Sequence, residues 1–159
     1  MKAGLLIVRD KYVSYVVYEP PKLPFERASF DLVTLTSVLE HVPVEQIPIL
    51  FAEIMRVLMP GGIASHHVAH KDHWSDTDSS LHPMNYLQYS KEKWKRYNPP
   101  VMFQNRVLHN QFAALLEKSK FHFEAETKVC QKAPQKIHDD FKALPPSDLQ
   151  TTHTWFTCW

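Results

Sequence analysis

Cysteine and glycine are both scarce in this sequence. Two cysteines, Cys130 and Cys158, cannot form a disulfide framework, and such low usage is typical of the reducing cytoplasm. The three glycines, Gly4, Gly61 and Gly62, form no glycine-rich loop. Because a backbone that approaches a nucleotide closely needs glycines at several positions, a complete glycine-rich nucleotide site is excluded.

The sequence also lacks an excess of either charge and a long apolar run. The 18 basic and 17 acidic side chains give a net charge of +1, which offers no electrostatic reason to expect nucleic acid or an acidic membrane as a partner. The apolar run at 5–8 is too short for a signal peptide or a membrane span. With 44% hydrophobic residues, we expect one cytoplasmic globular domain over 1–159.

Apolar periodicity predicts alternating strands and helices in the first half of the chain. Residues 12–18 are β-branched and aromatic, which predicts a strand that is covered on both faces. A second strand is expected at 30–36 and a third at 63–68. Between them, apolar residues recur every three or four positions over 47–58, which predicts an amphipathic helix. This order requires a crossover and so predicts a mostly parallel sheet.

The second half of the chain predicts a long loop and a terminal hairpin. Residues 69–105 are rich in polar and aromatic residues, and a loop insertion of this length is usually functional. Residues 121–130 alternate between apolar and polar side chains, which predicts a half-exposed strand. This strand should pair antiparallel with another at 152–159. We therefore expect an α/β domain with a carboxyl-terminal antiparallel hairpin.

Four segments together resemble a known family. In chain order they are LPFERASFDLV at 23–33, SVLEHV at 37–42, EIMRVLMPGG at 53–62 and GIASHHV at 62–68. The combination resembles the class I S-adenosylmethionine-dependent methyltransferases of type 11. The resemblance implies a Rossmann-like three-layer sandwich, S-adenosylmethionine as cofactor, and methyl transfer to a small-molecule or glycan-type acceptor.

The sequence departs from this family at its amino-terminal side. The family begins with two strand–helix units, the first of which carries a glycine-rich loop for the cofactor. Here only residues 1–11 precede the first predicted strand, which is too short for a βαβ unit of about 30 residues. The resemblance therefore implies a fold truncated at its amino-terminal side and a chain whose methyl transfer is impaired on its own. A truncated gene product, a mis-started reading frame and a degenerate relative all fit this pattern.

The resemblance also implies the residues that contact the cofactor. Glu19 corresponds to an acidic residue that binds the adenine amino group, although a solvated acid at a strand end fits it equally. Thr36, Ser37 and His41 lie at the end of the second strand of the matching region and would line the cofactor. His41 is the candidate catalytic residue, because a histidine near the methyl group can orient an acceptor or act as a general base. Its alternative role is that of a surface residue at a helix entry.

Histidine and aspartate crowd residues 66–78, HHVAHKDHWSDTD. His66, His70 and His73 have a spacing that could suit a metal, but no clear fourth ligand accompanies them, and we expect no metal. Loops after strands carry function, so His67 and His70 are the candidate substrate-binding residues. The alternative interpretation is that His67 and His70 are ordinary polar residues of a loop.

Two other functions compete with methyl transfer. The first is a non-catalytic methyltransferase-like protein that associates with itself or with a partner through an exposed sheet edge. The second is a small metal-dependent hydrolase built on the histidine-rich loop.

Overall fold

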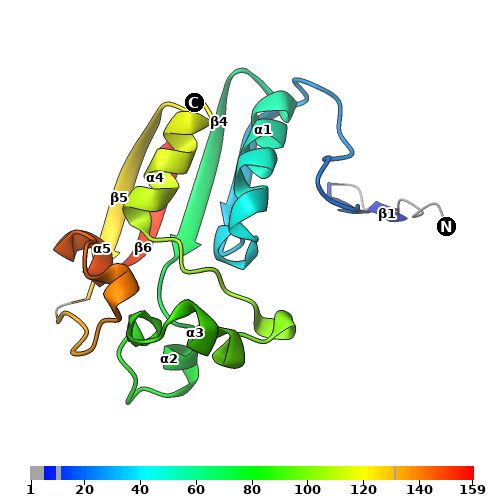
Figure 1. The fold of residues 1–159 in the computed structure, drawn as a ribbon. Coiled ribbons are helices and arrows are strands. Elements are labelled where there is room, and N and C mark those ends of the chain that lie inside the picture. The colour runs from blue at the N-terminus through cyan, green and yellow to red at the C-terminus, as the bar shows by residue number, and fades with distance from the viewer. Residues whose placement is uncertain (1–5, 10–11, 131) are drawn as a thin grey trace.

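The main sheet has four strands in the order β3-β4-β6-β5. The computed structural model describes residues 6–9, 12–130 and 132–159 (Figure 1). Among neighbouring strands of this sheet, only the β3–β4 pair is parallel, whereas the β4–β6 and β5–β6 pairs are antiparallel. The expected terminal hairpin is confirmed, but the expectation of a mostly parallel sheet is wrong. The reason is the position of β6. Strands β4 and β5 point the same way, but β6 lies between them and runs opposite to both, so two of the three strand pairs are antiparallel. The strands are β3 Phe30–Thr36, β4 Leu58–Ala69, β5 Phe123–Val129 and β6 Thr151–Cys158.

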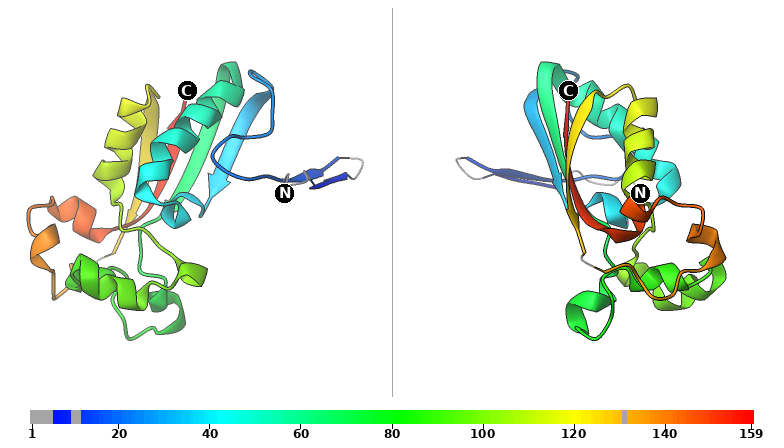
Figure 2. Two further views of the ribbon diagram at one scale, coloured as in Figure 1. Left: turned by 45° about the vertical axis from the view of Figure 1, so that its right-hand side comes forward. Right: turned by 90° about the vertical axis from the view of Figure 1, so that its left-hand side faces the viewer.

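Two helices, α1 (Ile47–Val57) and α4 (His109–Lys118), cover one face of this sheet (Figures 1 and 2). They enclose a core that includes Phe51, Phe112 and Phe156, each at most 1% exposed. In the part of the chain that the structure describes, no helix lies over the opposite face. The described residues therefore form two layers, one sheet and one layer of helices, whereas the resemblance implied a sandwich of three layers.

Helix α1 forms where the apolar spacing predicted it. Ile47, Phe51, Ile54 and Val57 are buried along one stripe, and they supply most of the reason for this segment to be helical. A proline stands in its first turn, where its missing N–H costs least. Two short 3-10 turns, η1 (Leu39–His41) and η2 (Val44–Gln46), lead from β3 into the helix.

Hydrogen bonds join two of the matching sequence segments, although about 30 residues separate them. Arg56 on α1 donates to the carbonyl oxygens of Phe25 at 2.8 Å and Leu23 at 2.9 Å. The Leu23 N–H donates to Glu53 at 2.8 Å, and Glu53 also pairs with Arg56. Because of these contacts, the pKa of Glu53 is lowered to about 2, chiefly by Arg56. The loop before β3 is thus fixed to the crossover helix.

A separate hairpin precedes this unit. Strands β1 (Leu6–Arg9) and β2 (Ser14–Val17) pair antiparallel with each other and stand apart from the main sheet (Figure 1). The side chains of Tyr15 and Val17 are exposed. The strand expected within 12–18 is confirmed as β2, but the expectation that it is covered on both faces is wrong. A run without alternation specifies extended backbone but not the partner that would cover it.

The predicted loop insertion contains helices of its own. They pack with a carboxyl-terminal segment into a second small core that includes Tyr86, Trp94 and Phe141. No helix in the described residues is long and apolar enough to cross a membrane. The short elements around this core are α2 Trp74–Thr77, η3 Asn85–Gln88, α3 Lys91–Tyr97, η4 Pro100–Met102, η5 Asp139–Phe141 and α5 Pro146–Gln150.

Candidate functional site

The candidate site lies at the carboxyl ends of the parallel strands β3 and β4. Ser37 ends β3 in the left-handed region, with φ of 52°, and its N–H donates to the carbonyl of His67 at 3.0 Å. This turn directs the chain into η1, which carries Glu40 and His41. The carboxyl edge is where open α/β sheets bind their ligands, because the chain reverses there and leaves backbone and side chains unpaired.

One short segment, Phe103–Asn105, holds the two sides of the site together, and we call it the bridging segment. On the η1 side, the Asn105 N–H donates to the Glu40 carbonyl at 2.7 Å. The Asn105 side chain donates to the carbonyls of Leu39 and Val42, both at 2.8 Å. The Phe103 carbonyl lies 2.7 Å from Nδ1 of His41.

The bridging segment also binds the loop that follows β4. The His73 N–H donates to the side-chain oxygen of Gln104 at 3.3 Å, and the Gln104 amide donates to the carbonyl of Lys71. Gln104 and Asn105 are both buried. The position of His73 relative to His41 is therefore set by hydrogen bonds to one continuous segment of chain.

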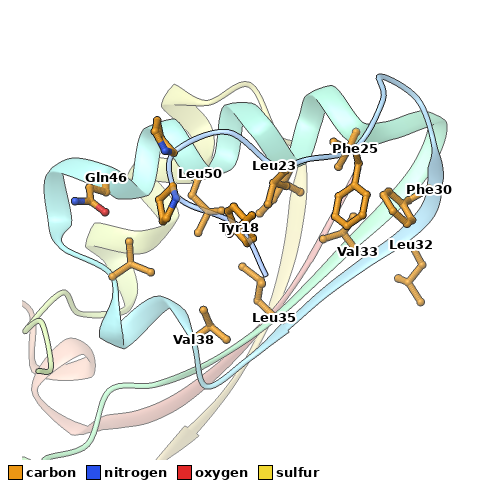
Figure 3. Close-up of a pocket in the computed structure, with 15 residues that line it drawn as sticks. Tyr18, Leu23, Phe25, Phe30, Leu32, Val33, Leu35, Val38, Gln46 and Leu50 are labelled. Carbon is orange, nitrogen blue, oxygen red and sulfur yellow. The ribbon is translucent and has the colours of Figure 1, made fainter. Parts of the chain in front are cut away.

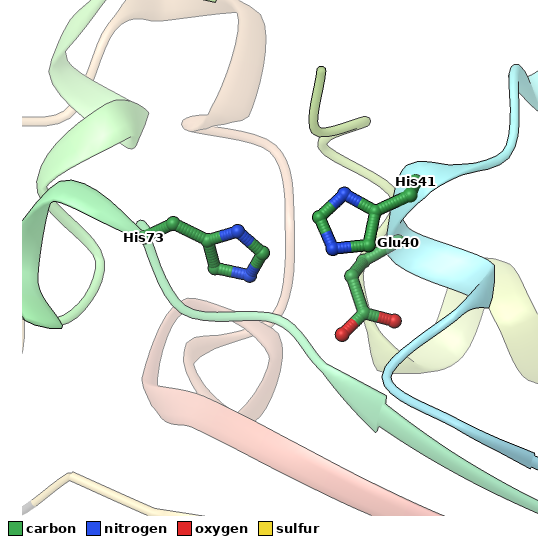
Figure 4. Close-up of side chains that lie close together, drawn as sticks. All are labelled: Glu40, His41 and His73. Atoms are coloured by element: carbon green, nitrogen blue, oxygen red, sulfur yellow. The ribbon is translucent and has the colours of Figure 1, made fainter. Parts of the chain in front are cut away.

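Glu40, His41 and His73 converge between these two sides (Figure 4). One ligand atom from each side chain lies within 4.8 Å of the others, and we call the three the Glu40–His41–His73 cluster. The centroids of the two imidazole rings are 5.0 Å apart, with the ring planes inclined at 53°. The sequence did not predict this cluster, because 33 and 32 positions separate His73 from Glu40 and His41.

The electrostatics of the cluster follow from burial. Glu40 is 2% exposed, and its burial raises the pKa of the carboxyl group. Its Oε1 accepts a hydrogen bond from the Ala69 N–H at 3.3 Å, whereas Oε2 has no hydrogen-bond partner among the described residues. Burial lowers the pKa of His73, and the neighbouring His41 lowers it further.

A second group of rings lies on the face of the sheet that α1 and α4 leave open. His67 stacks on His153 with 5.4 Å between ring centroids, and it lies 4.8 Å from the ring of Trp155. Its Nδ1 is 3.3 Å from Oγ of Ser37. Of the residues predicted from the sequence, Ser37, His67 and Thr36 come together here, since Thr36 pairs with His67 in the β3–β4 register.

Glu19 and His41 do not share a cleft. Glu19 is exposed beside the cis Pro20-Pro21 peptide, next to an apolar cavity of about 360 Å³ (Figure 3). The side chains that line this cavity include Tyr18, Leu35 and Leu50, but neither Glu19 nor His41. The cavity opens between the loop before β3, β3 itself and α1.

Two other histidines of the segment 66–78, His66 and His70, are buried in the core. His66 is fully buried against Phe51, with ring centroids 5.8 Å apart. His70 is 2% exposed, and its two ring nitrogens bond to the Val107 carbonyl at 3.1 Å and to Thr154 at 2.9 Å. No ring nitrogen of His70 is left for a substrate, and neither ring can join His73 around an ion. The side chains of His66, His70 and His73 therefore do not converge on one point.

Comparisons with known proteins bear on the sequence of the first part of the chain and on its fold. Residues 2–65 match the family model described as a methyltransferase domain. The comparison with curated proteins gives no match.

Solved structures resemble the fold over most of this chain. The structure of an S-adenosylmethionine-dependent methyltransferase from Archaeoglobus fulgidus is similar with a TM-score of 0.52 and 11% identity, over 83% of this chain and 60% of that one. The complex between the Haloferax volcanii Trm112 methyltransferase activator and a methyltransferase gives a TM-score of 0.51 and 15% identity, over 86% and 57%. The chain thus spans less than two thirds of either chain that it matches.

These two likenesses show the fold, and the sequence match covers the segment from β1 into β4 that carries η1 and α1. The resemblance in sequence to a methyltransferase domain thus concerns residues 2–65, and the two solved structures extend the likeness of fold to most of the chain.

Proposed function

We propose that this chain serves S-adenosylmethionine-dependent methyl transfer to a small-molecule or glycan-type acceptor. The observation that carries the proposal is the crossover from β3 through η1 and α1 to β4, the one parallel connection of the sheet. Its carboxyl edge bears Ser37 and His41, and the matching family segment contains both. Ligands of open α/β sheets bind at such an edge.

The proposed roles follow the position of each residue. Thr36, Ser37 and His41 contact the cofactor, with His41 nearest the methyl group, whereas Glu19 shares no cleft with His41 and takes no part at this edge. His67, beside Ser37, contacts the acceptor. Methyl transfer is an in-line displacement on a sulfonium, so alignment supplies much of the rate, and His41 orients the acceptor.

Cofactor binding by this chain alone should be weak. Its three glycines form no glycine-rich loop, and close backbone approach to the donor is what such a loop supplies. Contacts are then confined to the edge around Ser37. We expect affinity for the demethylated cofactor, S-adenosylhomocysteine, on the order of 1 mM, equivalent to about 4 kcal/mol.

Nuclear magnetic resonance can test this proposal at such affinity. S-adenosylhomocysteine should shift the amide signals of Ser37 and His41 in a saturable manner, and Ser37→Ala should weaken the effect. The matched control is Ser119→Ala, which removes a hydroxyl bonded within α4 and away from this edge. A titration to several millimolar that moves neither signal would contradict the proposal.

A second function has its own supporting observation, and we propose it as the alternative. Strand β3 lies at the edge of the sheet, Leu32 on it is 55% exposed, and the apolar cavity runs alongside. An unprotected edge of this kind pairs readily with another strand. In this alternative, a second copy of the chain associates through β3, and the protein acts without catalysis.

Sedimentation velocity over a range of concentrations separates this alternative from the first function. Leu32→Lys should abolish association, because charge on an edge strand blocks pairing. The control is Ile49→Lys, which places the same charge at a 46% exposed position of α1. Equal sedimentation of both variants and the unmodified chain at every concentration would refute association through β3.

A further inference from the structure

We propose that Glu40, His41 and His73 bind a divalent transition-metal ion, for which Zn²⁺ is the best match. Two imidazoles and one carboxylate form the protein ligand set of many catalytic zinc sites, in which the remaining position is left to water or to a substrate. The three ligand atoms come from two segments, η1 and the loop after β4, and lie within 4.8 Å of one another.

Glu40 has an acceptor atom that needs a partner. The side chain is 2% exposed, and its Oε2 is buried with no hydrogen-bond partner in the described part of the chain. Leaving such an atom buried and unsatisfied is costly, and most buried polar atoms have a partner. A cation between Glu40 and the two histidines supplies that partner.

His41 has one nitrogen already oriented. Its Nδ1 lies 2.7 Å from the carbonyl oxygen of Phe103, which can only accept, so Nδ1 carries the hydrogen in this contact. The other nitrogen, Nε2, then has a free lone pair. Metal-binding histidines almost always donate their second N–H to a carbonyl or carboxylate in this way, which fixes both the tautomer and the ring.

His73 is held in range by its backbone. Its N–H bonds to Gln104, so the residue is fixed to the same bridging segment that fixes His41. No hydrogen bond or ion pair in the described residues joins Glu40 directly to His41 or His73. The three groups are therefore too far apart to bond with one another, yet near enough for one ion to reach all of them.

The spacing requires a small closure. Ligand atoms around a tetrahedral zinc ion lie roughly 3.4 Å apart, given metal–ligand bonds of about 2.0–2.1 Å. From separations of up to 4.8 Å, the ligand atoms have to close by at most about 1.4 Å, which rotation of the half-buried His73 side chain provides. Three protein ligands leave a coordination position for an oxygen or nitrogen donor. Metal binding itself does not depend on the proposed methyl transfer.

The proposal can be tested with the metal alone. Isothermal titration of the untagged full chain with ZnCl₂ should give one site per chain. Glu40→Gln, which keeps an acceptor for the Ala69 N–H, and His73→Asn should each weaken binding at least 10- to 100-fold, the loss typical even for residues that only support a ligand. The control is His122→Asn, an exposed histidine at the opposite end of the sheet.

A spectroscopic measurement keeps the test independent of folding defects. Co²⁺ bound by two imidazoles and a carboxylate at low coordination number absorbs visible light far more strongly than the aqueous ion. Binding should also shift the imidazole signals of His41 and His73 in the unmodified chain. Zinc binding that His122→Asn removes and His73→Asn retains would overturn the proposal. A zinc titration in which the imidazole signals of His41 and His73 do not shift would also overturn the proposal.

Discussion

His66→Leu should make the protein more stable, and increasingly so as the pH falls. His66 is fully buried on β4, it stacks on Phe51, and neither ring nitrogen has a hydrogen-bond partner among the described residues. Leucine has a similar volume and no polar atoms. Because a buried unsatisfied polar group costs about 1–3 kcal/mol, removing it should raise the free energy of unfolding by that order at neutral pH.

The pH dependence follows from the shifted titration of His66. Burial lowers its pKa in the folded state to about 4, against about 6.5 when unfolded. The unfolded chain therefore binds a proton first as the pH falls, and stability declines from pH 6.5 until the loss is complete near pH 4. At pH 5, which is about 1.5 units below the pKa of the unfolded state, the free energy of unfolding is lower by about 2 kcal/mol.

Urea unfolding at pH 7.5 and pH 5.0 measures this effect. The stability gap between His66→Leu and the unmodified protein should widen by about 2 kcal/mol between the two conditions. Burial lowers the pKa of His70 to about 4 as well, but His70 is present in both proteins, so its contribution cancels. His122→Leu, at an exposed position, should show no such widening. A gap for His66→Leu that stays constant with pH would refute the reasoning.

Three further substitutions test the contacts that build the site and the crossover. Asn105→Ala leaves the carbonyls of Leu39 and Val42 without their donor and should cost about 2 kcal/mol or more in urea unfolding; a cost near zero would mean that the bridging segment does not fix η1. Arg56→Gln should return the pKa of Glu53 from about 2 toward its ordinary value, because Arg56 is the largest cause of that shift. A carboxyl titration followed by NMR measures this pKa, and an unchanged pKa of Glu53 would contradict the expectation. Gly62→Ala should lower the melting temperature more than Gly61→Ala: a Cβ at Gly62 would lie 3.0 Å from the Met59 carbonyl, whereas Gly61 has open space and only its φ of 80° to penalise alanine, by about 1–2 kcal/mol. The reverse order would contradict the close approach at Gly62.

The sequence was a good guide wherever one element sets its own pattern. The stripe from Ile47 to Val57 specifies a helix face, and the alternation over 121–130 specifies a strand, so α1 and β5 could be predicted without knowing their neighbours. The expected half-burial of β5 is wrong, because every residue of this strand after Phe123 is exposed. Strand β3 was predicted with its observed bounds, 30–36. The order of strands was less accessible, because nothing local to β6 indicates that it inserts between β4 and β5.

The histidines show why local crowding is a poor guide to a site. Adjacent side chains of a strand point to opposite faces, so His66 enters the core while His67 reaches the open face. His70 follows the strand and is consumed by hydrogen bonds to Val107 and Thr154. Only His73, beyond the strand, is free to turn toward η1. Four residues that are close in sequence thus serve three different environments.

What assembles the candidate site is a pair of buried amides that carried no signal in the sequence. Gln104 and Asn105 stand next to each other, yet one binds the loop after β4 and the other binds η1. Side-chain amides can do this because each offers donors and an acceptor, and backbone in irregular loops needs both. Since the same strip of chain orients His41 through Phe103, the spacing of Glu40, His41 and His73 is fixed by contacts with the bridging segment and not by contacts among the three. The backbone around the three side chains is thus organised before any ligand arrives, and only the His73 ring has to rotate to meet the proposed ion.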